Sequence, residues 1–304
     1  MAPKVEKLCG NFKLGEAPFW DEDAQALYFV DINGYTINKY DPSTKRTTSA
    51  YVGRNVSIII PVKGKTDQFL VSLERQLVLV TWDGLSERPS KMEKLLEIEP
   101  DKPKNVFNDG KCDPSGRLWI GTMGGPPVVI ADIEHEKGTL YSLERGRAKM
   151  VPHVPRIGIA NGLAFDSAAK RFYYIDSRSG TVDAYDFDLQ EGRISNGRAV
   201  FTASKHGLHG MVFDGMTIDR DGNLYVAVWG SRVIKIDPRT PETLLGTIEM
   251  PAKIISSVCF GGPNMDELFV TSGQVGIVPG PADGATFKVT GLSAKGYPEV
   301  KIAL

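Results

Sequence analysis

Apolar and polar side chains alternate along most of this chain in the manner of β-strands. Residues 182–186 and 233–237 mix the two kinds with a period close to two, which marks strands with one buried and one exposed face. Other stretches, such as residues 172–176, are rich in aromatic and β-branched residues. Clusters that contain Asp and Gly, such as residues 113–116 and 219–222, precede most of these stretches and indicate hairpins.

The aromatic strand recurs six times, with between 42 and 54 residues from one copy to the next. Each interval leaves room for four strands, and four-stranded units at this period are typical of a β-propeller. No Trp-Asp dipeptide recurs at the ends of the units, which argues against the WD40 kind. The sequence therefore predicts an all-β fold, a six-bladed β-propeller with four-stranded antiparallel blades. The six copies are residues 27–31, 69–72, 118–121, 172–176, 224–227 and 268–271.

A closed ring has no linker, so we expect one domain that spans residues 1–304. We also expect a chain end to supply the outermost strand of the last blade, because pairing the ends removes an open sheet edge. Either residues 5–9 or residues 297–302 are suited to this, and the sequence does not decide between them.

Polar residues recur at equivalent positions of the predicted innermost strands. Asn108 and Asn161 are 53 residues apart, Asn161 and Asp214 are again 53 apart, and Glu16 lies 92 residues before Asn108. Equivalent positions in a ring face one axis, so these side chains should meet at one mouth of the channel. Two carboxylates and two amides form an oxygen-rich cup that suits a hard divalent cation, and without a cation such a cluster is costly. Asn-Gly and Asp-Gly are also ordinary turn dipeptides, so a structural role stays open.

Charge and cysteine content exclude several classes of function. The formal net charge is −1, so no basic field attracts nucleic acid or anionic lipid. Three cysteines without a CxxC pair favour free thiols in a reducing compartment. No apolar stretch is long enough to span a bilayer, and the N-terminus lacks the apolar core of a signal peptide. We expect a cytoplasmic monomer that acts on a small-molecule substrate and has no nucleic-acid or membrane partner.

Several short motifs follow one another over nearly the whole chain, and they are residues 15–18, 107–111, 121–123, 138–141, 161–163, 173–177, 214–216, 259–262 and 290–292. In this combination the sequence resembles the regucalcin, gluconolactonase and luciferin-regenerating-enzyme family of six-bladed propellers. The resemblance implies one divalent metal cation bound by Glu16, Asn161 and Asp214. It also implies that Asn108 touches substrate or metal-bound water and that Asp214 is a general base. An oxygen cup does not choose sharply between Ca²⁺, Mg²⁺, Mn²⁺ and Zn²⁺.

Two positions differ from the relatives that hydrolyse sugar lactones. Those relatives carry an arginine where this chain has Val106, and acidic residues where Gly124 and Gly125 follow Met123. A site that lacks groups to bind hydroxyls cannot recover the same selectivity for a polyol. We therefore expect Asn108, Val106 and Met123 to line a pocket for a flatter, less polar substrate.

The resemblance thus implies a metal-dependent enzyme of hydrolase type. Within the family the sequence is most similar to the luciferin-regenerating branch, which converts oxyluciferin to 2-cyano-6-hydroxybenzothiazole, a precursor of luciferin with D-cysteine. Two alternatives remain at this point: a sugar-lactone hydrolase of the gluconolactonase type, and a calcium-binding propeller without catalytic activity.

Overall fold

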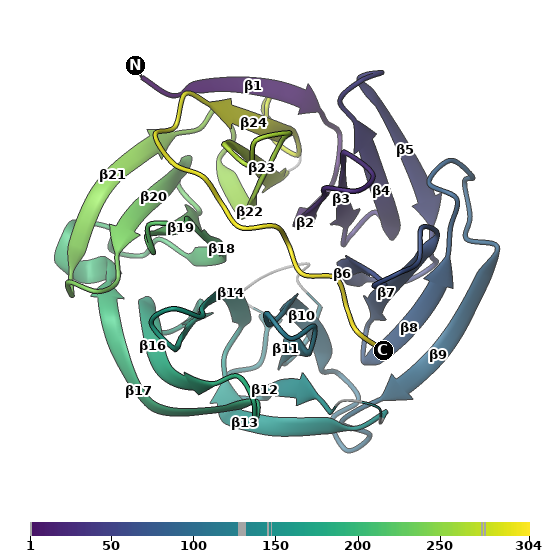
Figure 1. Ribbon diagram of the computed structural model, residues 1–304, viewed down its shortest axis with the longest axis horizontal. Helices are drawn as coiled ribbons and strands as arrows, with labels where there is room; N and C mark the ends of the chain where they lie inside the picture. Colours follow the sequence, from purple (N-terminus) through teal and green to yellow (C-terminus); the bar gives the residue numbers. More distant parts are fainter. Residues whose placement is uncertain (1, 127–131, 145, 147, 275, 277) are drawn as a thin grey trace.

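The chain folds into six four-stranded antiparallel sheets arranged as blades around a central channel (Figure 1). The computed structural model describes residues 2–126, 132–144, 146, 148–274, 276 and 278–304. This arrangement confirms the predicted six-bladed β-propeller. Among the described residues, no helix has the length and apolar character needed to cross a lipid bilayer.

Each of the first five blades is built from four consecutive strands, the innermost first. Blades 1 and 2 contain β2 (Gly15–Asp21), β3 (Ala26–Asp31), β4 (Thr36–Asp41), β5 (Arg46–Tyr51), β6 (Val56–Pro61), β7 (Gln68–Leu73), β8 (Gln76–Thr81) and β9 (Lys91–Glu97). Blades 3 and 4 contain β10 (Val106–Cys112), β11 (Leu118–Met123), β12 (Gly138–Leu143), β13 (Met150–Ile157), β14 (Ala160–Asp166), β15 (Arg171–Asp176), β16 (Thr181–Asp188) and β17 (Arg193–Thr202). Blade 5 contains β18 (Phe213–Ile218), β19 (Leu224–Val228), β20 (Arg232–Asp237) and β21 (Thr243–Glu249).

The sixth blade closes the ring by joining the two ends of the sequence. Its strands β22 (Ile254–Gly261), β23 (Glu267–Gly273) and β24 (Thr286–Thr290) are completed on the outside by β1 (Lys4–Cys9). Val5 pairs with Val289 in this antiparallel contact. Of the two chain ends left open by the sequence, the N-terminal one therefore closes the blade.

The hydrophobic core lies largely between neighbouring blades. Strands β3, β6 and β11 are buried along their whole length, whereas β9 on the outside of blade 2 is almost entirely exposed. Trp20 of blade 1 stacks on Phe269 of blade 6 with ring centroids 5.0 Å apart. Stacked aromatic contacts of this kind add to the free energy gained by burying apolar area.

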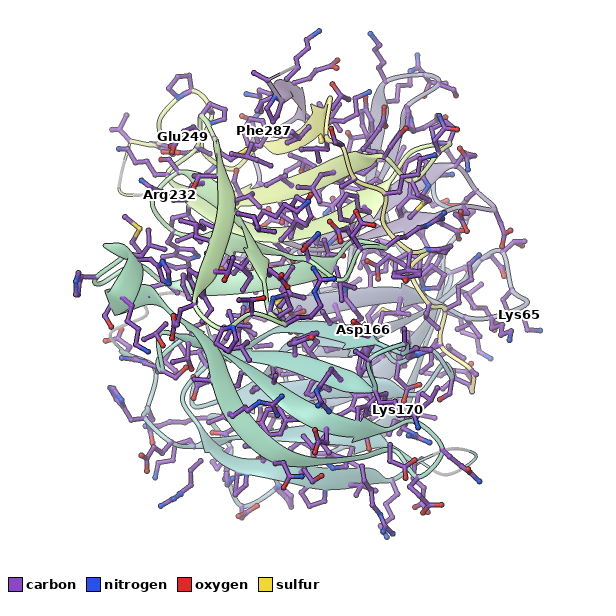
Figure 2. The ribbon with its side chains drawn as sticks, turned by 60° about the vertical axis from the view of Figure 1, so that its left-hand side comes forward. Lys65, Asp166, Lys170, Arg232, Glu249 and Phe287 are labelled. Carbon is purple, nitrogen blue, oxygen red and sulfur yellow. The ribbon has the colours of Figure 1, made fainter. Side chains whose placement is uncertain are left out.

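The two mouths of the channel carry different chain segments. In Figure 2, Asp166 and Lys170 of the β14–β15 hairpin lie towards the side where the C-terminal tail runs, and Arg232 and Glu249 lie towards the other side. The innermost strands begin at the mouth away from the tail. Glu16 and Asn161 stand near the starts of β2 and β14, so they belong to that mouth.

Candidate metal centre and substrate pocket

Every innermost strand carries a β-bulge at its channel-facing start. The register shifts between Glu16 and Phe19 in β2, between Phe107 and Gly110 in β10, and between Phe213 and Met216 in β18. The innermost strands β6, β14 and β22 are shifted at the equivalent place. A bulge adds a residue to one strand and changes the direction of its side chains. The repeated bulge explains how one polar residue per blade is presented to the channel.

One cavity at this mouth gathers most of the residues predicted from the sequence. Glu16 and Asp214, 198 positions apart in the chain, border it together. Its described lining comprises Leu14, Glu16, Ile32, Asn108, Met123, Ile133, Ile159, Asn161, Ser177, Val212, Asp214 and Trp229. The four polar residues at equivalent positions of the innermost strands thus border one cavity, and they are Glu16, Asn108, Asn161 and Asp214. Their role as ligands stays a prediction.

Asn161 is held in a single orientation by its neighbours. Its Nδ2 donates a 2.9 Å hydrogen bond to Ser177 Oγ, and Ser177 Oγ donates a 2.7 Å bond to the carbonyl of Phe213. This relay fixes which end of the amide faces the cavity. Asn161 Oδ1 is buried and has no hydrogen-bond partner among the described residues. Since buried polar atoms are nearly always paired, this oxygen is suited to a cation or a ligand.

Glu16 and Asp214 are both buried, and each accepts a hydrogen bond from a neighbouring residue. Ala17 N donates to Glu16 Oε2 at 2.9 Å, and Trp229 Nε1 donates to Asp214 Oδ2 at 2.6 Å. Burial, followed by the charges of Asp214 and Asp109, raises the pKa of Glu16 well above its usual value. Burial raises the pKa of Asp214 in the same way, against the hydrogen bond from Trp229. A divalent cation held here would oppose this effect and keep both carboxylates ionised.

A third carboxylate, Asp109, lies deeper in the channel. It accepts a 2.7 Å hydrogen bond from Gly110 N. Although Asp109 keeps some contact with the channel space, removal from bulk water raises its pKa to about 6, while the charge of Lys111 opposes the rise. In the sequence, Asp109 stands out only as part of the motif of residues 107–111. Its place beside Asn108 in the β10 bulge is the signal that could have identified it.

Asn108 links two blades at the edge of the cavity. Its Nδ2 donates a 2.8 Å hydrogen bond to the carbonyl of Ala160 in blade 4. The backbone carbonyl oxygen of Asn108 accepts a 2.6 Å hydrogen bond from Ser57 Oγ in blade 2. Asn108 therefore holds three neighbouring blades together at the point where its amide borders the cavity.

The opposite wall of the cavity is apolar. Met123, Ile133 and Ile159 border the cavity and form a buried cluster with Val106. Val106 pairs with Met123 across β10 and β11 and packs in the same cluster, but it is not among the residues that line the cavity. Met123 therefore forms the wall and Val106 supports it; direct contact of Val106 with a substrate stays a prediction.

The donor set fits a hard cation better than a soft one. Within the described part of the chain, no three His, Cys, Asp or Glu side chains come together as a metal site. The predicted set is of a different kind, two carboxylates and one amide oxygen, which are oxygen donors that Ca²⁺ and Mg²⁺ accept together with water. Trp229 was not anticipated, and Ser177 stood out only as part of the motif of residues 173–177. Both follow the second strand of a blade, where the sequence carries no repeated polar position.

Comparison with known proteins places this architecture in a family. The SMP-30/Gluconolactonase/LRE-like region matches residues 14–274. Regucalcin of Gallus gallus is 35% identical over 299 residues, which cover 96% of each chain. Regucalcin of Homo sapiens is 36% identical over 292 residues, which cover 94% of this chain and 93% of that protein. A solved luciferin-regenerating enzyme superimposes with a TM-score of 0.93 at 44% identity over 100% of both chains. The chain belongs to the SMP-30/gluconolactonase/LRE-like family of six-bladed propellers.

Proposed function

We propose that this protein is a metal-dependent enzyme of hydrolase type that acts on a small, flat and largely apolar molecule. The observation that carries the proposal is the buried Oδ1 of Asn161, which has no hydrogen-bond partner in the described part of the chain and borders the same cavity as the buried carboxylates of Glu16 and Asp214. These three oxygen donors would hold the cation. When bound, a divalent cation polarises a substrate carbonyl and lowers the pKa of water towards neutrality.

The side chains divide the remaining work between them. Asp214, oriented by Trp229, accepts the proton of the attacking water, because the bound cation would keep its carboxylate ionised and able to act as a general base. Asn108 borders the cavity and orients the substrate. Met123, Ile133 and Ile159 provide an apolar wall that excludes water from the reacting bond.

An oxyluciferin-type substrate suits this pocket and agrees with the 44% identity to a luciferin-regenerating enzyme. Water adds to the carbonyl carbon of the thiazolone ring, and the bond from that carbon to the ring nitrogen breaks. The bond between the thiazolone sulfur and the ring carbon that carries the benzothiazole then breaks. This gives the nitrile, 2-cyano-6-hydroxybenzothiazole, and thioglycolate. One water is consumed: its hydroxyl ends in the new carboxyl group, and its other proton ends on the thiol sulfur.

Two other functions are compatible with the same oxygen-rich site. A sugar lactonase agrees with family membership, and the polar floor formed by Asn108 and Asp109 supports it. A calcium-binding role without catalysis agrees with the 24% identical structure described as a calcium-binding regucalcin of Agrobacterium tumefaciens, a similarity that shows the fold alone. The apolar wall favours the aryl substrate over a polyol.

A turnover assay distinguishes the three. Metal is first removed from the protein with a chelator, and one divalent cation at a time is then added back. Turnover of oxyluciferin, gluconolactone and an aryl ester is measured with each cation. We expect cation-dependent cleavage of the aryl substrates, lost in Asp214→Asn. Faster turnover of gluconolactone would favour the lactonase. Tight Ca²⁺ binding without turnover of any substrate would favour the calcium-binding role and contradict the enzyme.

We further propose that the protein works as a monomer in the cytoplasm, without nucleic-acid or membrane partners. A net charge of −1 and a ring whose last sheet is closed by β1 support this, because closure leaves few edges for self-association. Light scattering of the purified protein tests the oligomeric state, and a dimer would contradict it.

A further inference from the structure

The residues after β24 form a strap across the channel mouth opposite the candidate metal centre (Figure 1). We define the strap as residues 295–303. Its backbone is tied to blade 5 by Arg220 N donating to Lys295 O at 2.7 Å, and to blade 2 by Ile302 N donating to Pro61 O at 3.0 Å. Further contacts reach three more blades, through Gly296 N to Met265 O, Ala303 N to Gly116 O, and Lys301 Nζ to Asp21 Oδ1. The strap is thus built into the ring.

From the middle of the strap, Glu299 reaches into the channel. Its Oε1 lies 3.1 Å from Lys111 Nζ, with side-chain exposures of 9% for Glu299 and 21% for Lys111. Both residues border an internal cavity that is also lined by Ala17, Asp109 and Met216. Ala17 follows Glu16, and Met216 lies two residues after Asp214. The ion pair therefore lies in the channel between the strap and the cup.

Lys111 is a potential obstacle to cation binding. Among the described residues that line this internal cavity and the cup, it is the only one with a cationic side chain, against Glu16, Asp109, Asp214 and Glu299. Charges in a water-poor channel are weakly screened, so an uncompensated ammonium there repels a divalent cation. The ion pair with Glu299 neutralises it.

We propose that Glu299 is a positioning residue for the metal site: by neutralising Lys111, the strap preserves the negative charge of the cup for a divalent cation. The inference rests on the proposed function, since it assumes that Glu16, Asn161 and Asp214 bind the cation. It adds that cation affinity depends on a residue from the far mouth of the channel, which acts through Lys111 and touches neither cation nor substrate.

Calorimetric titration of the metal-free full-length protein with Ca²⁺ tests this. We expect Glu299→Gln to weaken Ca²⁺ binding about tenfold and Lys111→Met to tighten it several-fold. Both estimates follow from the Coulomb interaction between one unit charge in the channel and the bound cation. The double variant should return towards the wild-type affinity. Damage to packing would weaken binding in both single variants, so the opposite signs separate charge from structure.

Two further variants keep the test decisive. Glu299→Asp retains the charge and should stay close to the wild-type affinity. Lys301→Met removes an ion pair of the strap with Asp21, outside the two cavities, and should leave Ca²⁺ affinity unchanged. Equal weakening in Glu299→Gln and Lys111→Met, or no change in either while the wild type binds Ca²⁺, overturns this inference alone. If the wild type binds no Ca²⁺, Mg²⁺, Mn²⁺ or Zn²⁺, the proposed function fails and takes this inference with it.

Discussion

Trp229 Nε1 donates a 2.6 Å hydrogen bond to Asp214 Oδ2, which joins the end of β19 to the bulge of β18 at the cavity. The indole fixes one carboxylate oxygen of Asp214 at the edge of the cavity. This contact explains how a carboxylate on a bulged strand keeps one direction, because a bulge alone leaves the side chain freedom that a catalytic base cannot have.

Replacing Trp229 by Phe should therefore lower turnover while the fold remains intact. An aromatic ring remains at this position, but the N–H donor is gone and Asp214 loses its orientation. We expect kcat on the aryl substrate to fall roughly tenfold to a hundredfold, the range for a misplaced acid–base group. Steady-state kinetics at saturating cation measures this. Trp82→Phe is the matched control, since Trp82 donates to the carbonyl of Ser86 away from the cavity; equal losses in both variants would contradict the assignment.

Asn161→Ala should remove cation binding without unfolding the protein. The variant deletes the buried oxygen that has no partner among the described residues, together with a hydrogen bond to Ser177. We expect the Ca²⁺ affinity to fall by about a hundredfold or more, since only two protein ligands remain. Titration calorimetry gives the affinity and thermal unfolding gives the stability.

Asn38→Ala provides the control for that experiment. Asn38 is fully buried in blade 1 and donates to the carbonyl of Phe29, so its loss should cost stability by about 1–3 kcal/mol and leave Ca²⁺ affinity unchanged. A loss of cation binding in Asn38→Ala as large as in Asn161→Ala would show that both act through general destabilisation.

Met123→Ala tests the apolar wall. Met123 is fully buried and borders the cavity with Ile133 and Ile159. Its truncation should raise KM for the aryl substrate by about tenfold or more, because one missing methylene group in an apolar pocket already costs about tenfold and this variant removes three heavy atoms. Ca²⁺ affinity should not change. Met92→Ala, on the exposed face of β9, should behave as the wild type. Improved turnover of the aryl substrate in Met123→Ala would contradict the proposed pocket.

Much of the fold could be predicted because the same strand pattern recurs once in each blade. The strand spacing gives the number of blades, and the 53-residue steps from Asn108 to Asn161 and on to Asp214 place three cavity residues in one phase. The orientation of Asn161 depends on Ser177, a residue with no repeated position, so the phase alone could not predict it. Residues 5–9 and 297–302 were both open as the outer strand of the last blade, and only the pairing of Val5 with Val289 decides between them.

Cation binding should stabilise the protein more at pH 8 than at pH 5. Burial raises the pKa of Glu16 and of Asp214 above their ordinary values. The folded, metal-free protein therefore holds protons that the unfolded chain releases, and its stability falls as pH rises from the unfolded pKa of about 4 through the folded values. A cation replaces those protons and adds about 2.7 kcal/mol at a hundred times its Kd. Thermal unfolding with Ca²⁺ or with chelator, at both pH values, measures this. The Glu16→Gln/Asp214→Asn variant should lose the pH-dependent difference; its persistence there would place the cation elsewhere.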